Sequence, residues 1–410
     1  MPNHHLLPHL FRTEFSKIVS VLCKHFGFEQ METAEDIASD TFLTAVQSWG
    51  IEGTPANPTA WLYTVAKNKA KNFLHRQSIF DKRIHPELKK ENTTINSSEI
   101  DLSATNINDS QLQMMFAVCH PAISNESQIS LSLRILCGFG IQEIADAFLT
   151  TKDVINKRLT RAKEKLREEK VSIAFPTEKE LEERLDTVLT TIYLLFNEGY
   201  YSASQNDILR KDLCLEAMRL CTMLIENEST NKPSANALLA LMCFHASRFA
   251  ARVNDHGEIL LYNEQDSNLW NQNFINKGGY FLKQSSIGNR ITTYHIEAGI
   301  AYWNTQPEST DKWKNILDLF NTLLQINYSP IAALNRIYAV SKVNGKEQAI
   351  GEAEELNLTN NHLFHLLLGE LYTTIDTNKA IDHYQLAYNL SKTDNERLKI
   401  WKKLESLKAE

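Results

Sequence analysis

The sequence predicts an all-α protein built from two small helical domains and a larger helical C-terminal domain. Apolar residues recur at the 3.6-residue spacing of amphipathic helices along almost the whole chain. Only residues 254–270 have the pattern of a strand or an extended loop. The length of 410 residues, with 43% hydrophobic residues, 14 glycines and 10 prolines, is typical of a globular protein of two or three domains.

Composition also limits the class of protein. No window holds eighteen apolar residues, and the N-terminus lacks a basic stretch followed by an apolar core. We therefore expect no membrane span and no signal peptide, and hence a cytoplasmic protein. The six cysteines are scattered and form no C-x-x-C pair, which predicts reduced, buried thiols rather than disulfides or a zinc site.

Charge is distributed unevenly along the chain. The formal net charge of −7 arises in residues 176–410, because residues 1–175 hold 20 basic and 20 acidic side chains. Within that neutral part, residues 62–90 carry eight Lys or Arg against two acids, and residues 152–170 carry eight against four. Two local basic patches suit phosphate binding, whereas charge alone is also compatible with solvated helix faces.

Residues 10–77 form the first predicted domain, in which an acidic helix precedes a basic one. The acidic helix, over residues 34–49, begins with Glu35, Asp36 and Asp40 and has an apolar stripe on another face. An acidic helix beside a basic helix in a neutral domain suggests a protein partner on one side and nucleic acid on the other.

The basic helix, over residues 57–77, opens with Asn57 as its N-cap and Pro58 at its first position. Its lysines and arginine lie away from its apolar face. Trp61 and Tyr63 stand beside this basic stripe, a pairing that favours single-stranded nucleic acid through stacking and backbone attraction. The alternative for Trp61 is a place in the core.

Residues 78–110 are rich in Asn, Ser, Thr and charge, which predicts a linker. Residues 111–170 follow as a second small helical domain that ends in a helix-turn-helix: a short helix over residues 141–149, a turn, and a helix capped by Thr151. The apolar side chains of the last helix share one face, and its opposite face carries Lys, Arg and Asn, which suit a major groove. An ordinary helical hairpin with a solvated basic face is the alternative.

Residues 177–410 are predicted to form the larger helical domain. Residues 235–247 are apolar almost all round, as in a central buried helix. Near the C-terminus, Glu-Gln-Ala-Ile at residues 347–350 recurs as Asn-Lys-Ala-Ile at residues 378–381, and Gly369 precedes the second copy. This spacing resembles a tetratricopeptide repeat, with an unrelated helical bundle as the alternative.

No motif predicts catalysis, because the chain lacks a phosphate-binding glycine loop, a Ser/His/Asp arrangement and a metal-ligand spacing. We therefore expect no enzyme activity, no cofactor and no metal. His4, His5 and His9 have no acidic or cysteine partner nearby. A buried ion-pair network, rather than a pocket, is predicted for a polar cluster in the extension: His245, Arg248, Arg252, Asp255, Glu264 and Asp266.

Long segments of the chain resemble a known family. The helix NPTAWLYTVAKNKAKNFLHR, the polar linker and the closing RLTRAKEKLRE are similar to those of the extracytoplasmic-function sigma factors of bacterial RNA polymerase. The segments TVLTTIYLLFNEGYYSAS, LLALMCFHASRFAARVNDHGEILLYNEQDSNLW and YHIEAGIAYW resemble the subgroup with a fused, tetratricopeptide-like extension of the DUF6596 type. Asn268 departs from the arginine that this resemblance predicts after Gln265 and Asp266.

The resemblance implies a partner for each basic or acidic helix. Contacts with the beta-prime coiled coil of core RNA polymerase are implied for Asp36, Asp40, Phe42 and Gln47. Contacts with the minus-ten promoter DNA are implied for Trp61, Tyr63, Lys67, Asn68, Lys69, Lys71 and Arg76. The second domain would lie at the beta flap and read the minus-thirty-five element through Lys152, Asn156, Lys157, Arg158 and Arg161.

The function implied by the resemblance is that of a bacterial alternative sigma factor, which directs promoter recognition and melting. The acidic extension would replace a separate anti-sigma factor and either mask the basic helices or brace the polymerase complex, and a signalling protein or ligand would act there. One alternative is a helix-turn-helix regulator with a tetratricopeptide-like sensor domain and no sigma activity. A scaffold that binds only proteins is a third interpretation.

Overall fold

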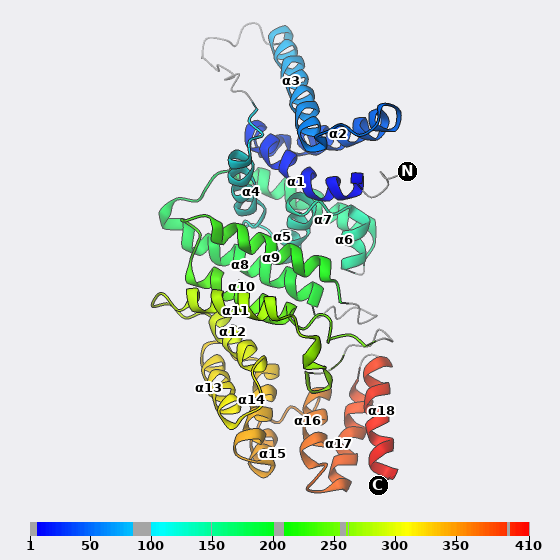
Figure 1. Cartoon of the computed structure of the whole chain (residues 1–410), viewed down its shortest axis with the longest axis vertical. Helices are drawn as coiled ribbons and strands as arrows, with labels where there is room; N and C mark the ends of the chain where they lie inside the picture. The colour runs from blue at the N-terminus through cyan, green and yellow to red at the C-terminus, as the bar shows by residue number, and fades with distance from the viewer. Residues whose placement is uncertain are drawn as a thin grey trace. The chain divides into compact units, whose positions relative to one another are not determined.

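The protein is helical throughout the part that the computed structural model describes: residues 6–84, 100–148, 150–200, 209–254, 260, 262–391 and 394–409 (Figure 1). The structure is 78% helical, and these residues contain 18 α-helices and no strand. The predicted all-α class is therefore confirmed. All six cysteines are buried and free, as their scattered spacing predicted.

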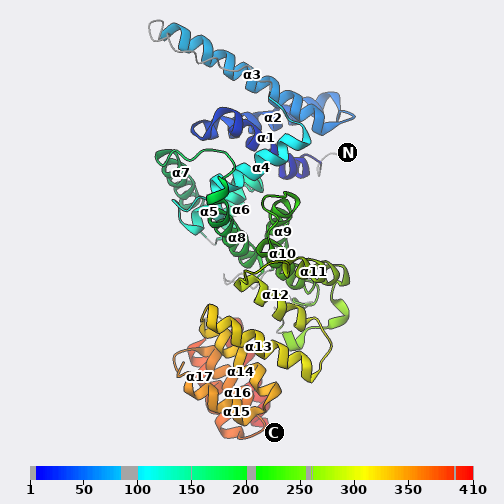
Figure 2. The same ribbon diagram turned by 90° about the vertical axis from the view of Figure 1, so that its left-hand side faces the viewer.

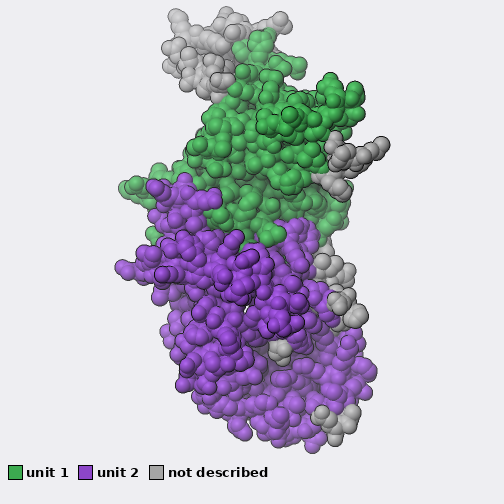
Figure 3. Space-filling view, viewed as in Figure 1, with its two compact units in different colours: residues 1–200, 215–224 green, residues 201–214, 225–410 purple. Residues whose placement is uncertain are grey.

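The chain divides into two compact units (Figure 3). The first consists of Met1–Tyr200 with Leu215–Leu224, and the second of Tyr201–Cys214 with Ile225–Glu410. Composition predicted that the larger helical domain begins at residue 177. The first unit nevertheless includes Glu178–Tyr200, which contacts α4 and α5, and Leu215–Leu224 of the helix that follows.

The helices of the first unit are, in chain order, α1 (Leu6–Phe26), η1 (Phe28–Gln30), α2 (Met31–Glu52), α3 (Pro58–Ile84), α4 (Ala104–Val118), α5 (Asn125–Leu131), the π-helical turn η2 (Ser132–Leu136), α6 (Ile141–Ala147), α7 (Lys152–Glu168), α8 (Glu178–Tyr200) and α9 (Lys211–Glu226), of which Leu215–Leu224 belongs to this unit. The first helix, α1, contacts α2, α3 and α4. Its side chains Phe15, Ile18 and Leu22 are fully buried, since their helical spacing directs them to these neighbours.

Helices extend into both ends of the segment that composition predicted to be a linker. The long helix α3 continues to Ile84 (Figures 1 and 2), and α4 begins at Ala104, where the Ser103 side chain accepts a hydrogen bond from the Asn106 amide. Polar composition does not stop a helix, whereas Pro86 disfavours helical backbone at the residue before it. The linker prediction otherwise falls on residues 85–99, which lie outside the described part of the chain.

Helices α8 and α9 are tied to the first unit by specific hydrogen bonds. The Arg184 guanidinium of α8 donates to the carbonyl of Phe116 at the end of α4. Thr191 Oγ1 donates to Gln128 Oε1 of α5 at 2.8 Å, and both side chains are buried. From α9, Arg219 Nη2 donates to the Leu136 carbonyl at 2.8 Å. The two arginines thus satisfy carbonyl groups at helix ends, where the helix leaves them unpaired.

The second unit begins with a buried central helix. Its helices in chain order are α10 (Pro233–Ala246), the short turns η3 (Tyr262–Glu264) and η4 (Ser267–Leu269), α11 (Gln272–Ser285), α12 (Thr293–Asn304), α13 (Thr310–Ile326), α14 (Pro330–Val343), α15 (Lys346–Glu355), α16 (His362–Tyr372), α17 (Thr377–Leu390) and α18 (Asp394–Ala409). Helix α10 is buried on nearly all sides and packs along α11 and α12. A strand or an extended loop was predicted over residues 254–270. The described residues of this range include the turns η3 and η4, and residues 255–259 and 261 lie outside the described part of the chain.

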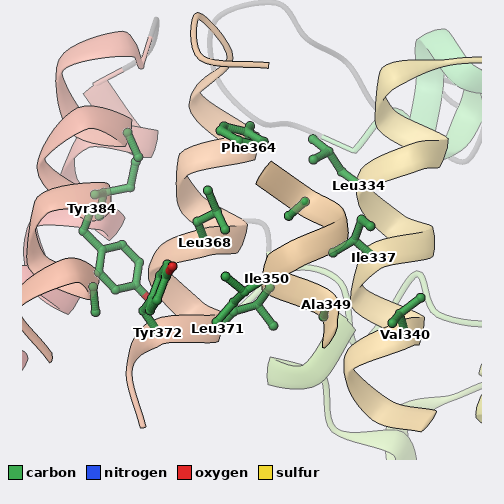
Figure 4. Close-up of a cluster of buried hydrophobic side chains, with 14 of the residues drawn as sticks. Leu334, Ile337, Val340, Ala349, Ile350, Phe364, Leu368, Leu371, Tyr372 and Tyr384 are labelled. Carbon is green, nitrogen blue, oxygen red and sulfur yellow. The ribbon is translucent and has the colours of Figure 1, made fainter. Parts of the chain in front are cut away.

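The C-terminal helices pack in sequence, each on the next, from α13 to α18. Figure 4 shows their core, which includes Leu334, Ile337, Val340, Ala349, Ile350, Phe364, Leu368, Leu371, Tyr372 and Tyr384. A Cβ atom at Gly369 would lie 3.0 Å from a Tyr384 ring carbon, so the glycine allows α16 and α17 to approach closely. This contact accounts for the Gly369 spacing noted in the sequence.

A membrane-spanning helix was not expected. Among the described residues, no helix combines the length and the apolar character needed to cross a bilayer.

Candidate nucleic-acid interface

Helix α2 has a buried face and an exposed face of distinct chemistry. The exposed face carries three of the residues for which polymerase contacts were predicted, Asp36, Asp40 and Gln47. Phe42 lies on the other face: it is 5% exposed and packs edge-on against Phe11, with ring centroids 5.0 Å apart. Phe42 therefore belongs to the core, because its helical spacing places it with the buried side chains of α2.

Two apolar side chains of α2 lie outside its buried face. The sequence analysis did not single out Leu43, and it wrongly placed Val46 in the apolar stripe of this helix together with Ile37, Phe42, Ala45 and Trp49. Leu43 and Val46 are each 55% exposed and lie at helical spacing among the exposed polar residues. Large apolar side chains grouped on an exposed face are a common feature of protein-binding surfaces. The signal in the sequence was a polar helix face interrupted by Leu and Val at a three-residue spacing.

The two aromatic residues at the start of α3 are half-buried and contact neighbouring helices. Trp61 packs edge-on against Trp49 of α2, with ring centroids 5.3 Å apart. Tyr63 Oη donates to Glu14 Oε2 of α1 at 2.5 Å. Burial and the neighbouring carboxylate raise the pKa of Tyr63 far above its usual range. Both residues thus join α3 to the other helices, and contact of their rings with DNA bases stays a prediction.

The basic stripe of α3 is open to solvent at three of the predicted DNA-contacting positions, Asn68, Lys71 and Arg76. Lys67 and Lys69 are half-buried. The Asn57 side chain accepts a hydrogen bond from the Ala60 amide at 3.0 Å, as expected of the predicted N-cap. The exposed cations along this helix can contact phosphate groups.

Helices α6 and α7 are joined by a short turn, and α7 has the amphipathic character that was predicted for it. The Thr151 side chain accepts a hydrogen bond from the Val154 amide at its N-terminus. The apolar face is buried through Ile155, Leu159, Ala162 and Leu166. On the opposite face, the exposed residues include Lys152, Asn156, Lys157, Thr160 and Arg161.

Arg158 is the exception among the α7 residues predicted to read DNA. Its guanidinium lies 5.2 Å from the centre of the Phe148 ring and donates to Ser130 Oγ of α5 at 3.4 Å. The side chain is partly buried between these neighbours. Arg158 therefore holds α7 to the rest of its domain and does not lie with the exposed cations.

The structure shows contacts for part of the polar cluster predicted in the extension. Arg248 is buried, with one guanidinium nitrogen 3.1 Å from His245 Nδ1 and its charge over the Tyr262 ring. Asp266 is exposed and accepts hydrogen bonds from the backbone and side chain of Asn268. Asp255 lies outside the described residues.

Metal binding by this protein was not expected from its sequence. Within the described parts of the chain, no three His, Cys, Asp or Glu side chains are grouped so that they could hold an ion. His9 is exposed, and His4 and His5 precede the first described residue.

Two segments of the chain match known protein families. Residues 10–79, which comprise most of α1, all of α2 and most of α3, match Sigma-70 region 2, and residues 184–286 match a family of unknown function, DUF6596. The chain belongs to the sigma-70 family, with a fused C-terminal extension. Membership implies interaction with core RNA polymerase and promoter DNA, and a sigma-factor-like role in transcription initiation.

The chain is also similar to a relative over most of its length. An uncharacterized protein of Rhizobium meliloti (strain 1021) is 32% identical over 351 residues, which cover 84% of this chain and 82% of the relative. The two proteins therefore belong to one family over most of their lengths. No solved structure matches the chain. In this sigma-70 family protein, α6 and α7 lie between the two matched segments, so DNA reading by α7 stays a prediction.

Proposed function

We propose that this protein is an alternative sigma factor of the extracytoplasmic-function type, with a fused regulatory domain of tetratricopeptide-like helices. The observation that carries the proposal is the position of two exposed surfaces within the segment that matches Sigma-70 region 2. One is the acidic and apolar face of α2, and the other is the basic stripe of α3. A sigma factor needs both, one for polymerase and one for promoter DNA.

The docking face is defined here as Asp36, Asp40, Leu43, Val46 and Gln47 of α2. Its carboxylates attract a basic partner, and its two apolar side chains provide area that leaves water on association. This pattern fits the beta-prime coiled coil that the family resemblance implied. Because Phe42 is buried, its place on this face is taken by Leu43.

In the proposed mechanism, the two basic surfaces act on different parts of a promoter. The exposed side chains of α3 hold phosphates at the minus-ten element, while α7 reads the minus-thirty-five element through Asn156, Lys157 and Arg161. Opening DNA costs about 1.4 kcal/mol of stacking per base-pair step. Contacts of protein and polymerase with the separated strands offset this cost, and no covalent step is required of this chain.

Run-off transcription tests the proposal. Purified core RNA polymerase is incubated with a pool of genomic upstream fragments, with and without this protein. We expect discrete new transcripts that are lost in the double variant Lys157→Glu, Arg161→Glu. Lys165→Glu is the matched control, because Lys165 is an exposed cation of the same helix that pairs with Glu169 of that helix.

The polymerase contact is tested separately by co-purification. Leu43→Glu with Val46→Glu should abolish retention on immobilised core polymerase, whereas Leu386→Glu, an exposed site in α17, should not. Tight promoter binding without polymerase, combined with no retention on core enzyme, would instead support the helix-turn-helix regulator. Retention without transcripts would indicate that the extension requires its signal.

A further inference from the structure

Two histidines join neighbouring helices inside the C-terminal core. His365 of α16 is 4% exposed, and His383 of α17 is half-buried. Their Nδ1 atoms lie 3.0 Å apart, which is a hydrogen-bond distance. The ring centroids are 5.3 Å apart and the ring planes differ by 28°, so the two rings meet edge to edge, as a bond between an imidazole N–H and a lone pair requires. We call these two residues the histidine pair.

The carbonyl of Thr359 determines which nitrogen atoms of the pair carry hydrogen. His365 Nε2 lies 2.8 Å from this carbonyl oxygen, which can only accept, so Nε2 of His365 donates. A neutral His365 then has its lone pair on Nδ1, and the Nδ1–H of His383 donates to it. A first proton adds to His383 Nε2 and leaves this bond intact. A second proton has no site, because the remaining lone pair is already engaged in the bond.

The charged groups nearest to the pair lie on α15 and α17. Glu354 of α15 accepts a hydrogen bond from Tyr372 Oη at 2.9 Å, and the Tyr372 ring is parallel to that of His383, with centroids 5.6 Å apart. Lys379 and Asp382 belong to α17 itself. Burial, followed by the partner histidine, lowers the pKa of His383. Lys379 adds to this shift, whereas Glu354 and Asp382 oppose it.

Charged side chains of the other helices around α16 and α17 have partners of their own. These pairs are Lys403 of α18 with Glu370, Glu396 of α18 with His362, and Arg336 of α14 with Glu352 of α15. Among the described residues, neither member of the histidine pair forms an ion pair with a carboxylate that would favour a second proton.

We propose that the histidine pair is a proton-sensitive latch, which holds α16 against α17 while it binds no more than one proton and opens when it takes up a second. Opening separates the helices at Gly369 and Tyr384, where they approach closely, and uncovers the Tyr384 ring, which is 2% exposed (Figure 4). The extension would then register acidification as a change in its C-terminal helices. The proposal does not depend on the sigma-factor role.

The direction of the pH response follows from the number of protons that each state binds. Below the ordinary histidine pKa of about 6.5, the open pair binds one proton more than the closed pair. The latch is therefore fully closed above this pH and opens as the pH falls below it. One excluded proton raises the equilibrium constant for opening by about tenfold between pH 7.5 and 5.5.

Hydrogen–deuterium exchange of the full chain at pH 7.5 and 5.5 tests the latch, after correction for the intrinsic pH dependence of exchange. Backbone amides of α16 and α17 should lose protection by about tenfold at the lower pH, because exchange reports local opening. Those of α13 and α14 should keep their protection, since these two helices contain no histidine.

Glutamine variants separate the latch from other effects of acid. His365→Gln and His383→Gln each replace one titrating ring by an amide that both donates and accepts. The one histidine left can bind its proton without breaking the bond, so the tenfold loss should disappear in both variants. His362→Gln is the matched control, because His362 lies on the same helix outside the pair, and this variant should respond as the wild type does.

Two results would overturn the latch: equal protection of α16 and α17 at both pH values in the wild type, or a tenfold loss that persists in both glutamine variants. Circular dichroism at pH 7.5 checks that each variant folds. Each comparison is made between two pH values of one protein, so a variant whose helices are less protected overall still gives a result. The measurement needs neither polymerase nor DNA, and its outcome is therefore separate from that of the transcription test.

Discussion

Tyr63 and Glu14 illustrate how a residue at a predicted DNA surface can serve the fold. The hydroxyl of Tyr63 on α3 donates to the buried carboxylate of Glu14 on α1, and Lys17 also pairs with that carboxylate at 2.9 Å. This bond joins two helices of region 2. A hydrogen bond to a charged group contributes about 1.5–3 kcal/mol.

We therefore predict that Tyr63→Phe lowers the free energy of unfolding by about 1–2 kcal/mol, because the carboxylate keeps one partner. Binding of single-stranded minus-ten DNA by the polymerase complex should not change. Asn68→Ala, at an exposed position of the same helix, should weaken that binding and leave stability unchanged. Chemical denaturation and fluorescence anisotropy measure the two effects, and weaker DNA binding by Tyr63→Phe would contradict this role.

For single residues, the sequence predicts burial better than it predicts which neighbours a long side chain contacts. Helical spacing identified the buried face of α7 and the exposed positions of Asn156, Lys157 and Arg161. It did not place Arg158, since its side chain turns towards Phe148 and Ser130, which lie on other elements. Long side chains reach neighbours that only the tertiary fold brings near.

The start of α12 shows how a single helix end can depend on pH. His295 Nδ1 accepts from the Thr292 amide at 3.1 Å, and His295 Nε2 donates to the Ser285 carbonyl at 3.2 Å. Burial lowers the pKa of His295, so the unfolded chain binds a proton more readily than the folded one. The contribution of His295 to the free energy of unfolding is therefore fully present above the unfolded pKa of about 6.5, and it declines as the pH falls below that value.

We predict that His295→Gln removes this part of the pH dependence and keeps the cap, because Gln is an ordinary partner of Thr in a capping box. Between pH 7.5 and 5.5, the free energy of unfolding should fall further in the wild type than in the variant. The difference between the two falls should be below about 1 kcal/mol, since the half-buried ring is partly screened by solvent. Urea unfolding at both pH values measures the difference. An equal change in the free energy of unfolding for the wild type and the variant would show that protonation of His295 is not linked to folding.

Adjacent glycines of α11 test the packing of α10 in the DUF6596 segment. A Cβ at Gly278 would lie 2.6 Å from the Phe244 ring, whereas a Cβ at Gly279 would meet nothing within 4 Å. Phe244 is 1% exposed and packs against Tyr302, so its ring has little room to move. The two helices therefore approach most closely at Gly278.

We expect Gly278→Ala to destabilise the protein by about 1–3 kcal/mol through overpacking. Gly279→Ala should be neutral or stabilise it by up to about 1 kcal/mol, because alanine favours helical backbone. Thermal unfolding of the two variants measures both effects. Equal melting temperatures would contradict the close approach of α10 and α11.

For the whole molecule, local patterns predicted the helices but not their grouping. The all-α class and the amphipathic α7 followed from periodicity. Periodicity did not predict the position of α8, since an amphipathic pattern gives no information about which neighbours cover the apolar face. Its hydrogen bonds from Arg184 to Phe116 and from Thr191 to Gln128 join residues more than sixty positions apart in the chain.

This grouping changes how the role of the extension should be tested. Deleting residues 177–410 removes α8 and α9 and leaves the carbonyls of Phe116 and Leu136 without their arginine partners. Deleting residues 227–410 keeps every helix of the first unit. We predict that fragment 1–226 unfolds cooperatively, whereas fragment 1–176 has lost its near-ultraviolet circular dichroism and aggregates. Cooperative unfolding of both fragments would show that α8 is dispensable for the first unit.

The folded fragment 1–226 then tests the role of the extension in transcription. Higher transcription with this fragment than with the full chain supports masking by the extension, and lower transcription supports bracing of the polymerase complex.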